Sequence, residues 1–145
     1  MLIPQILVRK KHSEAIAHYR EALRIDPANA IGHFNLGNAL TAVGDPGAGQ
    51  HFAEAVKHNP RFAEARYNLA LNLAKQNRNE EALAQFAEVV RLKPDLIDGH
   101  FNYGVALAKA RRFNEAVEQF EMVLRLDPQH AGAKQLLERA KGPGR

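Results

Sequence analysis

The chain has 145 residues, a formal net charge of +4 and no cysteine; 46% of its residues are hydrophobic and 25% are charged. This composition is typical of a soluble globular protein, and the lack of cysteine excludes disulfides, thiolate metal sites and a cysteine nucleophile. Ser13 and Thr41 are the only serine and threonine, so covalent hydrolytic catalysis has almost no candidate nucleophile.

The chain begins with a short apolar stretch, MLIPQILV, followed by basic residues. It is too short for a secretory signal, and no apolar run is long enough to span a membrane. We therefore expect a cytoplasmic protein without membrane association. Residues 1–12 are expected to form an N-terminal stub that either folds over a helix at 13–25 or leaves an apolar edge for self-association. The apolar residues of the stub are Leu2, Ile3, Ile6, Leu7 and Val8.

Four prolines recur at a nearly constant interval along the chain. Pro27, Pro60, Pro94 and Pro128 are separated by 33, 34 and 34 residues, and each ends a similar phrase: RIDP, KHNP, RLKP and RLDP. Self-similarity at this period is typical of stacked helical repeats. A fold of this kind acts through a surface more often than through a pocket.

Each full unit, aligned on its proline, contains two amphipathic helical patterns. The first helix carries a large residue, a small residue and a leucine, and the second carries an alanine and a phenylalanine. We expect the small residue to receive the aromatic ring of the second helix. The first-helix sets are Leu36-Gly37 with Leu40, Leu69-Ala70 with Leu73, and Tyr103-Gly104 with Leu107; the second-helix sets are Ala48 with Phe52, Ala82 with Phe86, and Ala116 with Phe120.

Polar residues are predicted to cap the second helices. Ser13, Asn79 and Asn114 each precede acidic residues, and Asp45 precedes a proline, which are typical signals of a helix start. After the last proline, residues 131–141 are predicted to form a capping helix with Leu136 and Leu137 on its apolar face.

These motifs resemble the tetratricopeptide repeat, and the match covers three full repeats from Ala30 to Pro128. The resemblance implies an all-α fold, a right-handed α-solenoid of stacked antiparallel helix pairs, in a single domain of residues 1–145. The expected divisions are a half repeat at 13–27, repeats at 28–60, 61–94 and 95–128, a capping helix at 129–141 and a tail at 142–145. The chain departs from the family pattern where a leading tryptophan is usual, because it has His33, Arg66 and His100 there.

In this family the first helices line a concave groove that commonly binds a peptide or partner helix. Two rows of residues repeat on these helices: Asn35, Asn68 and Asn102, and the aromatic residues Phe34, Tyr67 and Phe101. Asparagine is a weak helix former, but its carboxamide both donates and accepts, as a peptide backbone does. The asparagine row resembles the ladder of O-GlcNAc-transferase-type arrays, which implies binding of a peptide backbone. The alternative is that these asparagines only join neighbouring helices, and that the aromatic row packs between them.

A clamp for a C-terminal carboxylate is not expected. That family variant needs lysines and an arginine in the groove, whereas the corresponding positions here are Phe34, Asp98 and Asn102. Only Asn38 and Asn68 match that variant, and we include Asn38 among the expected groove residues.

Other kinds of site have weaker support in the sequence. His51 and His58 are two helical turns apart without a third ligand nearby in sequence, so we expect no metal site and no cofactor. The segment 44–49, GDPGAG, lacks the lysine of a phosphate loop and is expected to be a turn. The basic residues are dispersed, which argues against nucleic-acid binding.

We therefore expect a non-catalytic protein-interaction module that binds a peptide or partner segment in the groove. The alternatives are a self-assembling scaffold, homo-oligomeric through the N-terminal edge, or a fragment of a longer array. RNA binding, as in the related pentatricopeptide arrays, ranks below both.

Overall fold

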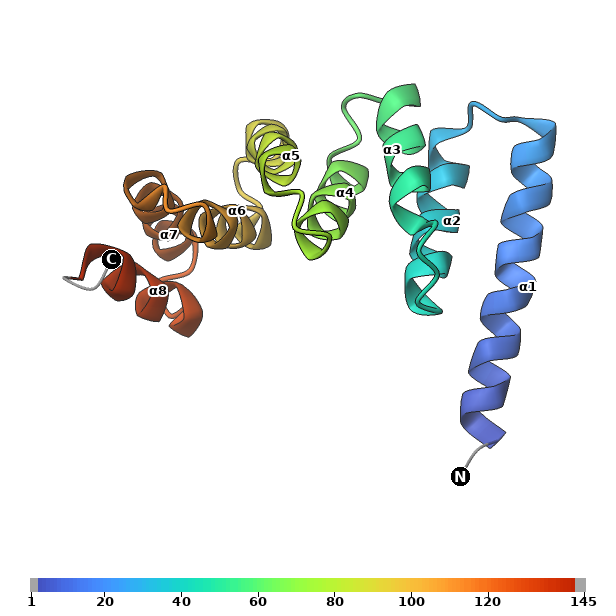
Figure 1. The fold of residues 1–145 in the computed structure, drawn as a ribbon, viewed down its shortest axis with the longest axis horizontal. Helices are drawn as coiled ribbons and strands as arrows, with labels where there is room; N and C mark the ends of the chain where they lie inside the picture. Colours follow the sequence, from blue (N-terminus) through green and yellow to red (C-terminus); the bar gives the residue numbers. More distant parts are fainter. Residues whose placement is uncertain (1–2, 143–145) are drawn as a thin grey trace. The chain divides into compact units, whose positions relative to one another are not determined.

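The computed structural model describes residues 3–142, and these residues form α-helices joined by turns, without strands. The predicted all-α architecture of antiparallel helix pairs is thereby confirmed (Figure 1). The helices are α1 (Ile3–Ile25), α2 (Ala30–Ala42), α3 (Ala48–His58), α4 (Ala63–Lys75), α5 (Asn79–Leu92), α6 (Ile97–Lys109), α7 (Phe113–Leu126) and α8 (Ala131–Lys141).

The chain divides into two compact units, with the boundary between Leu69 and Ala70 inside α4. In the first unit, α2 packs against both α1 and α3. In the second unit, α6 packs against α5 and α7, and α8 covers α7. Each unit therefore has its own core of first and second helices.

In two repeats, a glycine of the first helix faces a phenylalanine of the second helix. A Cβ atom added at Gly37 would lie 2.6 Å from the ring of Phe52, and one at Gly104 would lie 2.7 Å from the ring of Phe120. Both rings are almost completely buried. The predicted pairing of a small with a large residue is therefore confirmed in these two repeats.

The turn between the two helices of each repeat has the same backbone geometry. Gly44, Asn77 and Arg111 all have positive φ, at 72°, 60° and 61°. The next amide in each turn donates to a leucine carbonyl five residues earlier, which is the long hydrogen bond of a Schellman motif. These bonds are Asp45 N to Leu40 O (2.9 Å), Arg78 N to Leu73 O (3.0 Å) and Arg112 N to Leu107 O (2.9 Å).

The predicted caps differ from the observed ones. Asn79 lies inside the first turn of α5, whose N-cap is Arg78, and Asn114 lies inside the first turn of α7, whose N-cap is Arg112. Neither helix has a side-chain cap. Instead, Arg78 and Arg112 form 2.7 Å ion pairs with the glutamate three residues later. Asp45 accepts a hydrogen bond from the Gly47 amide, just before α3 begins.

The N-terminal segment differs most from expectation, because α1 continues without a break from Ile3 to Ile25. Ser13 is not an N-cap, since its hydroxyl donates to the Arg9 carbonyl inside the helix. The apolar stub does not fold back over the helix: Ile3 is 70% exposed and Ile6 60%. Leu2 lies outside the described residues.

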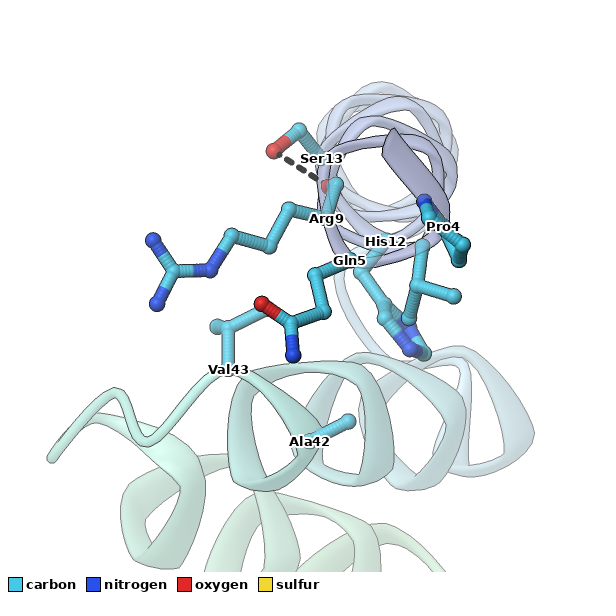
Figure 2. Close-up of a pocket in the computed structure, with 8 residues that line it drawn as sticks. Pro4, Gln5, Arg9, His12, Ser13, Ala42 and Val43 are labelled. Carbon is cyan, nitrogen blue, oxygen red and sulfur yellow. Dashed lines mark hydrogen bonds between the residues drawn. The ribbon is translucent and has the colours of Figure 1, made fainter. Parts of the chain in front are cut away.

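The extension of α1 runs past the end of α2 (Figure 1). Its first turns and the end of α2 line an open pocket, in which Gln5 reaches toward Ala42 and Val43 (Figure 2).

The helix α8 covers α7. It differs from the other first helices at the positions that contact the following second helix in the other repeats. Leu137 takes the place of Leu36, and it is buried together with Ala133 and Ala140. The positions equivalent to Gly37 and Leu40 are occupied by Glu138 and Lys141, which are exposed. Lys141 also forms a 2.9 Å ion pair with Glu121 of α7. The face that accepts a second helix elsewhere is therefore charged in α8.

Candidate functional site

The polar residues in place of the usual tryptophan have a shared structural role. Each lies six residues after a repeat-ending proline and makes a hydrogen bond to the carbonyl of that proline. Because a carbonyl only accepts, the side-chain nitrogen is the donor in each case. The three distances are 2.9 Å for His33 Nε2 to Pro27 O, 2.8 Å for Arg66 Nε to Pro60 O and 2.8 Å for His100 Nε2 to Pro94 O.

The asparagines of the predicted groove lie in three different settings. The Asn68 amide donates to the Asn38 carbonyl oxygen at 2.8 Å and so joins α4 to α2. The Asn102 amide donates to the backbone of Asp98 within α6. Asn35 is half-buried, and its side chain has no hydrogen-bond partner among residues 3–142. The three carboxamides therefore share a sequence position but not a hydrogen-bonding pattern.

One face of α2 is lined by exposed and half-buried side chains. Ile31, Asn35 and Asn38 follow at intervals of four and three residues and so lie on the same face. Ile31 is 64% exposed, and Asn38 is also exposed. This face combines an accessible apolar side chain with two carboxamides.

Two of the three residues of the aromatic row, Phe34 and Phe101, pack against other rings inside the units. The ring of Phe34 lies 4.8 Å from that of Phe62 and 6.3 Å from that of Phe52. The ring of Phe101 lies 4.8 Å from that of His130 and 6.1 Å from that of Phe120. Since these are typical aromatic packing distances, Phe34 and Phe101 contribute to the junctions between helices. Tyr67 is half-buried.

A cluster of three histidines and a glutamate lies between α2 and α3. His33 Nδ1 is 3.0 Å from His51 Nδ1, and His58 Nε2 is 3.3 Å from a carboxylate oxygen of Glu54. The ring of His33 also stacks on that of His58, with centroids 5.9 Å apart. Burial, followed by the proximity of His33, lowers the pKa of His51. Three ligand atoms of the cluster lie within 4.8 Å of one another, one each from His33, Glu54 and His58.

This cluster is the feature that sequence reasoning missed. His51 and His58 were expected to have no further ligand nearby, because His33 is 18 residues from His51 in sequence. A signal was present in the repeat alignment. His33 lies in the first turn of α2, while His51, Glu54 and His58 follow one face of α3 at steps of three and four residues.

None of the helices within the described part of the chain combines the length and apolar character needed to cross a membrane.

Comparison with known proteins gives a consistent family assignment. Models described as TPR repeat or tetratricopeptide repeat match residues 9–44, 34–97 and 97–130. A comparison with curated proteins finds no match.

Several solved structures share the fold. A MamA fragment from Desulfovibrio magneticus RS-1 is 23% identical with a TM-score of 0.82, covering 94% of this chain and 78% of that one. YrrB, a TPR protein described as having an unusual peptide-binding site, is 29% identical with a TM-score of 0.77, covering 90% and 68%. The first TPR of Spaghetti (RPAP3), bound to the HSP90 peptide SRMEEVD, is 20% identical with a TM-score of 0.71, covering 77% and 89%.

Proposed function

Since the chain belongs to the tetratricopeptide-repeat family, we propose that it is a non-catalytic interaction module that binds an extended peptide through its first helices. The observation that carries the proposal is the surface of the first unit formed by Ile31, Asn35, Asn38 and Asn68. Peptide binding by YrrB and by the RPAP3 repeat, as their descriptions state, supports the same class of function.

The hydrogen bond between Asn68 and Asn38 makes these carboxamides suitable for a peptide backbone. It uses one amide hydrogen of Asn68 and one lone pair of Asn38. The Asn68 oxygen remains as an acceptor and the Asn38 amide as a donor. The pair can therefore receive a backbone N–H and donate to a backbone C=O at adjacent points of an extended chain.

Asn35 adds a third carboxamide without a partner inside the described chain, and the exposed Ile31 adds an apolar contact. In the second unit, Asn102 occupies the same position of its first helix as Asn35 does in α2. Because Phe34 and Phe101 pack against other rings, we assign them to holding the first helices in position, with Tyr67 as the remaining candidate for ligand contact.

The test is a peptide-array experiment with Asn35, Asn68 and Asn102 changed together to alanine. We expect loss of the peptides that the original protein binds. Asn114→Ala is the matched control, because it makes the same chemical change on the exposed surface of α7. If the folded triple variant binds the same peptides with the same affinity, the asparagine surface is not the binding site.

A second candidate function is self-association through the extension of α1. Ile3, Ile6, Leu7 and Val8 are each more than half exposed, and an apolar group of this kind on one helix is typical of an interface. Light scattering over a range of protein concentrations tests it. We expect Ile6→Glu with Leu7→Glu to lower the average mass, whereas Ile25→Glu, at the other end of α1, leaves it unchanged. A strictly monomeric starting protein contradicts this candidate.

A further inference from the structure

We propose that His33, Glu54 and His58, together with His51, bind a divalent transition-metal ion of the zinc class between α2 and α3. This site is separate from the asparagine surface and does not depend on the proposed peptide binding.

The donor set suits such an ion. Imidazole nitrogens and a carboxylate oxygen are preferred ligands of Zn²⁺, which is usually four-coordinate and tetrahedral. With metal–ligand bonds of about 2.0–2.1 Å, neighbouring donor atoms of a tetrahedron lie about 3.3 Å apart. The two close pairs of this cluster are near that separation, at 3.0 Å for His33 with His51 and 3.3 Å for His58 with Glu54.

Three of the four residues, His33, Glu54 and His58, are also close enough to share one ion, and His51 faces His33 from α3. Ligand atoms of His33, Glu54 and His58 lie within 4.8 Å of one another, so movements of roughly 1–2 Å bring them to tetrahedral spacing. His33 is buried, whereas His58 is exposed and Glu54 half-buried. The ion therefore has a buried ligand on α2, more accessible ligands on α3 and access from solvent.

The Nε2 atom of His33 already makes a hydrogen bond of the kind that orients histidine ligands at metal sites. Its Nε2 donates to the Pro27 carbonyl at 2.9 Å, which leaves Nδ1 as the nitrogen with a lone pair in the neutral ring. A ligating histidine usually donates its other N–H to a carbonyl or carboxylate in this way, because that bond fixes the tautomer and the ring orientation.

One positive group competes for the carboxylate. Lys57 Nζ lies 3.6 Å from the same Glu54 oxygen that faces His58. The Lys57 side chain is 69% exposed, so it can return to water when a doubly charged ion takes its place.

In the second unit, the pair α6 and α7 has the same hydrogen bonds around its histidine but lacks metal ligands at the positions that correspond to Glu54 and His58. His100 Nε2 bonds to the Pro94 carbonyl and its Nδ1 lies 2.8 Å from Gln119, as His33 does with Pro27 and His51. In the repeat alignment, however, Glu54 and His58 correspond to Met122 and Leu126. The pair α6 and α7 therefore folds without a metal-binding set, and the combination of His33, His51, Glu54 and His58 occurs only in the pair α2 and α3.

The residues of α7 at the equivalent positions define the test variant. The triple change His51→Gln, Glu54→Met and His58→Leu installs the residues that the second unit already uses at the same positions. His12→Gln with His18→Gln, on α1, is the matched control for histidines outside the cluster.

The experiment uses the full chain without an affinity tag, first treated with a chelator and then titrated calorimetrically with Zn²⁺. We expect one ion per chain, a rise in melting temperature on binding, and visible absorption bands typical of tetrahedral coordination when Co²⁺ replaces Zn²⁺. The triple variant should bind at least about 100-fold more weakly, while the control on α1 keeps the original affinity.

If the triple variant proves poorly folded, His58→Leu alone, at a more exposed position, must weaken Zn²⁺ binding at least about tenfold. Absence of binding by the original chain overturns the proposal. Equal affinity of the original chain and the folded variants does so as well, because the ion is then held by other histidines.

Discussion

The turn inside each repeat allows a paired test of backbone strain. Gly44 and Arg111 have nearly the same φ, 72° and 61°, in equivalent turns. We consider Gly44→Ala, which puts a side chain into the left-handed region, and Arg111→Gly, which removes one from it. Because the two turns share their geometry, the two changes should have opposite effects on stability.

The magnitude follows from the surroundings of the two residues. A Cβ atom at Gly44 would have no atom within 4 Å, so the substitution changes only the backbone energy. The left-handed conformation costs an L-residue about 1–2 kcal/mol, and replacing glycine recovers up to about 1 kcal/mol through the lower entropy of the unfolded chain. We expect Gly44→Ala to lower the free energy of unfolding by about 1 kcal/mol.

In Arg111→Gly, the energy cost of the left-handed conformation is removed and the entropy of the unfolded chain rises, so both contributions change sign. The Arg111 side chain that is removed is exposed. We expect an increase of about 0.5–1 kcal/mol in the free energy of unfolding. Urea denaturation followed by circular dichroism measures both variants, with the midpoint changing and the slope constant. A neutral Gly44→Ala, or an Arg111→Gly that is less stable than the original protein, would refute the reasoning.

Three further predictions concern the packing and the ligand. Replacing His100 by phenylalanine removes its hydrogen bonds to Pro94 and Gln119 and should cost about 1–2 kcal/mol in thermal or urea unfolding; an unchanged midpoint would show that these bonds contribute nothing. Gly104→Val drives a branched side chain into the buried ring of Phe120, which a Cβ atom alone would approach to 2.7 Å. It should cost about 2–3 kcal/mol, and a loss below about 0.5 kcal/mol would mean that the helices separate easily. In fluorescence anisotropy, any affinity for the peptide SRMEEVD should be the same for its free-acid and C-terminally amidated forms, because the first helices have no lysine or arginine where the carboxylate clamp needs them; a strong preference for the free acid would contradict this.

The repeat architecture was predictable because it depends on spacing. The proline interval and the alternation of small and large residues are properties of the chain itself. They determine that Gly37 meets Phe52 and Gly104 meets Phe120, whatever the details of the loops.

The N-terminal extension was not predicted because two local signals compete. Ser13 followed by Glu14 is typical of a helix start, but Pro4 suits the first turn of a helix equally well, and no glycine separates the two. Continuation of the helix satisfies the backbone of residues between them, and Ser13 then bonds to the carbonyl of Arg9.

The histidine cluster depends on side-chain positions that spacing does not determine. Sequence places His51, Glu54 and His58 on one face of α3, but only the packing of α2 against α3 brings His33 to that face. In the asparagine row, the sequence position repeats, but the three side chains have different hydrogen-bonding environments. Whether that row binds a peptide stays a prediction.

The charged face of α8 has a consequence for protein design. Glu138 and Lys141 stand where the other first helices have a small residue and a leucine, so an appended second helix would find no groove for its phenylalanine. Changing Glu138→Gly and Lys141→Leu would restore that groove and create an acceptor for further modules. The length of the array at this end can thus be engineered through two side chains, without altering the repeats that precede them.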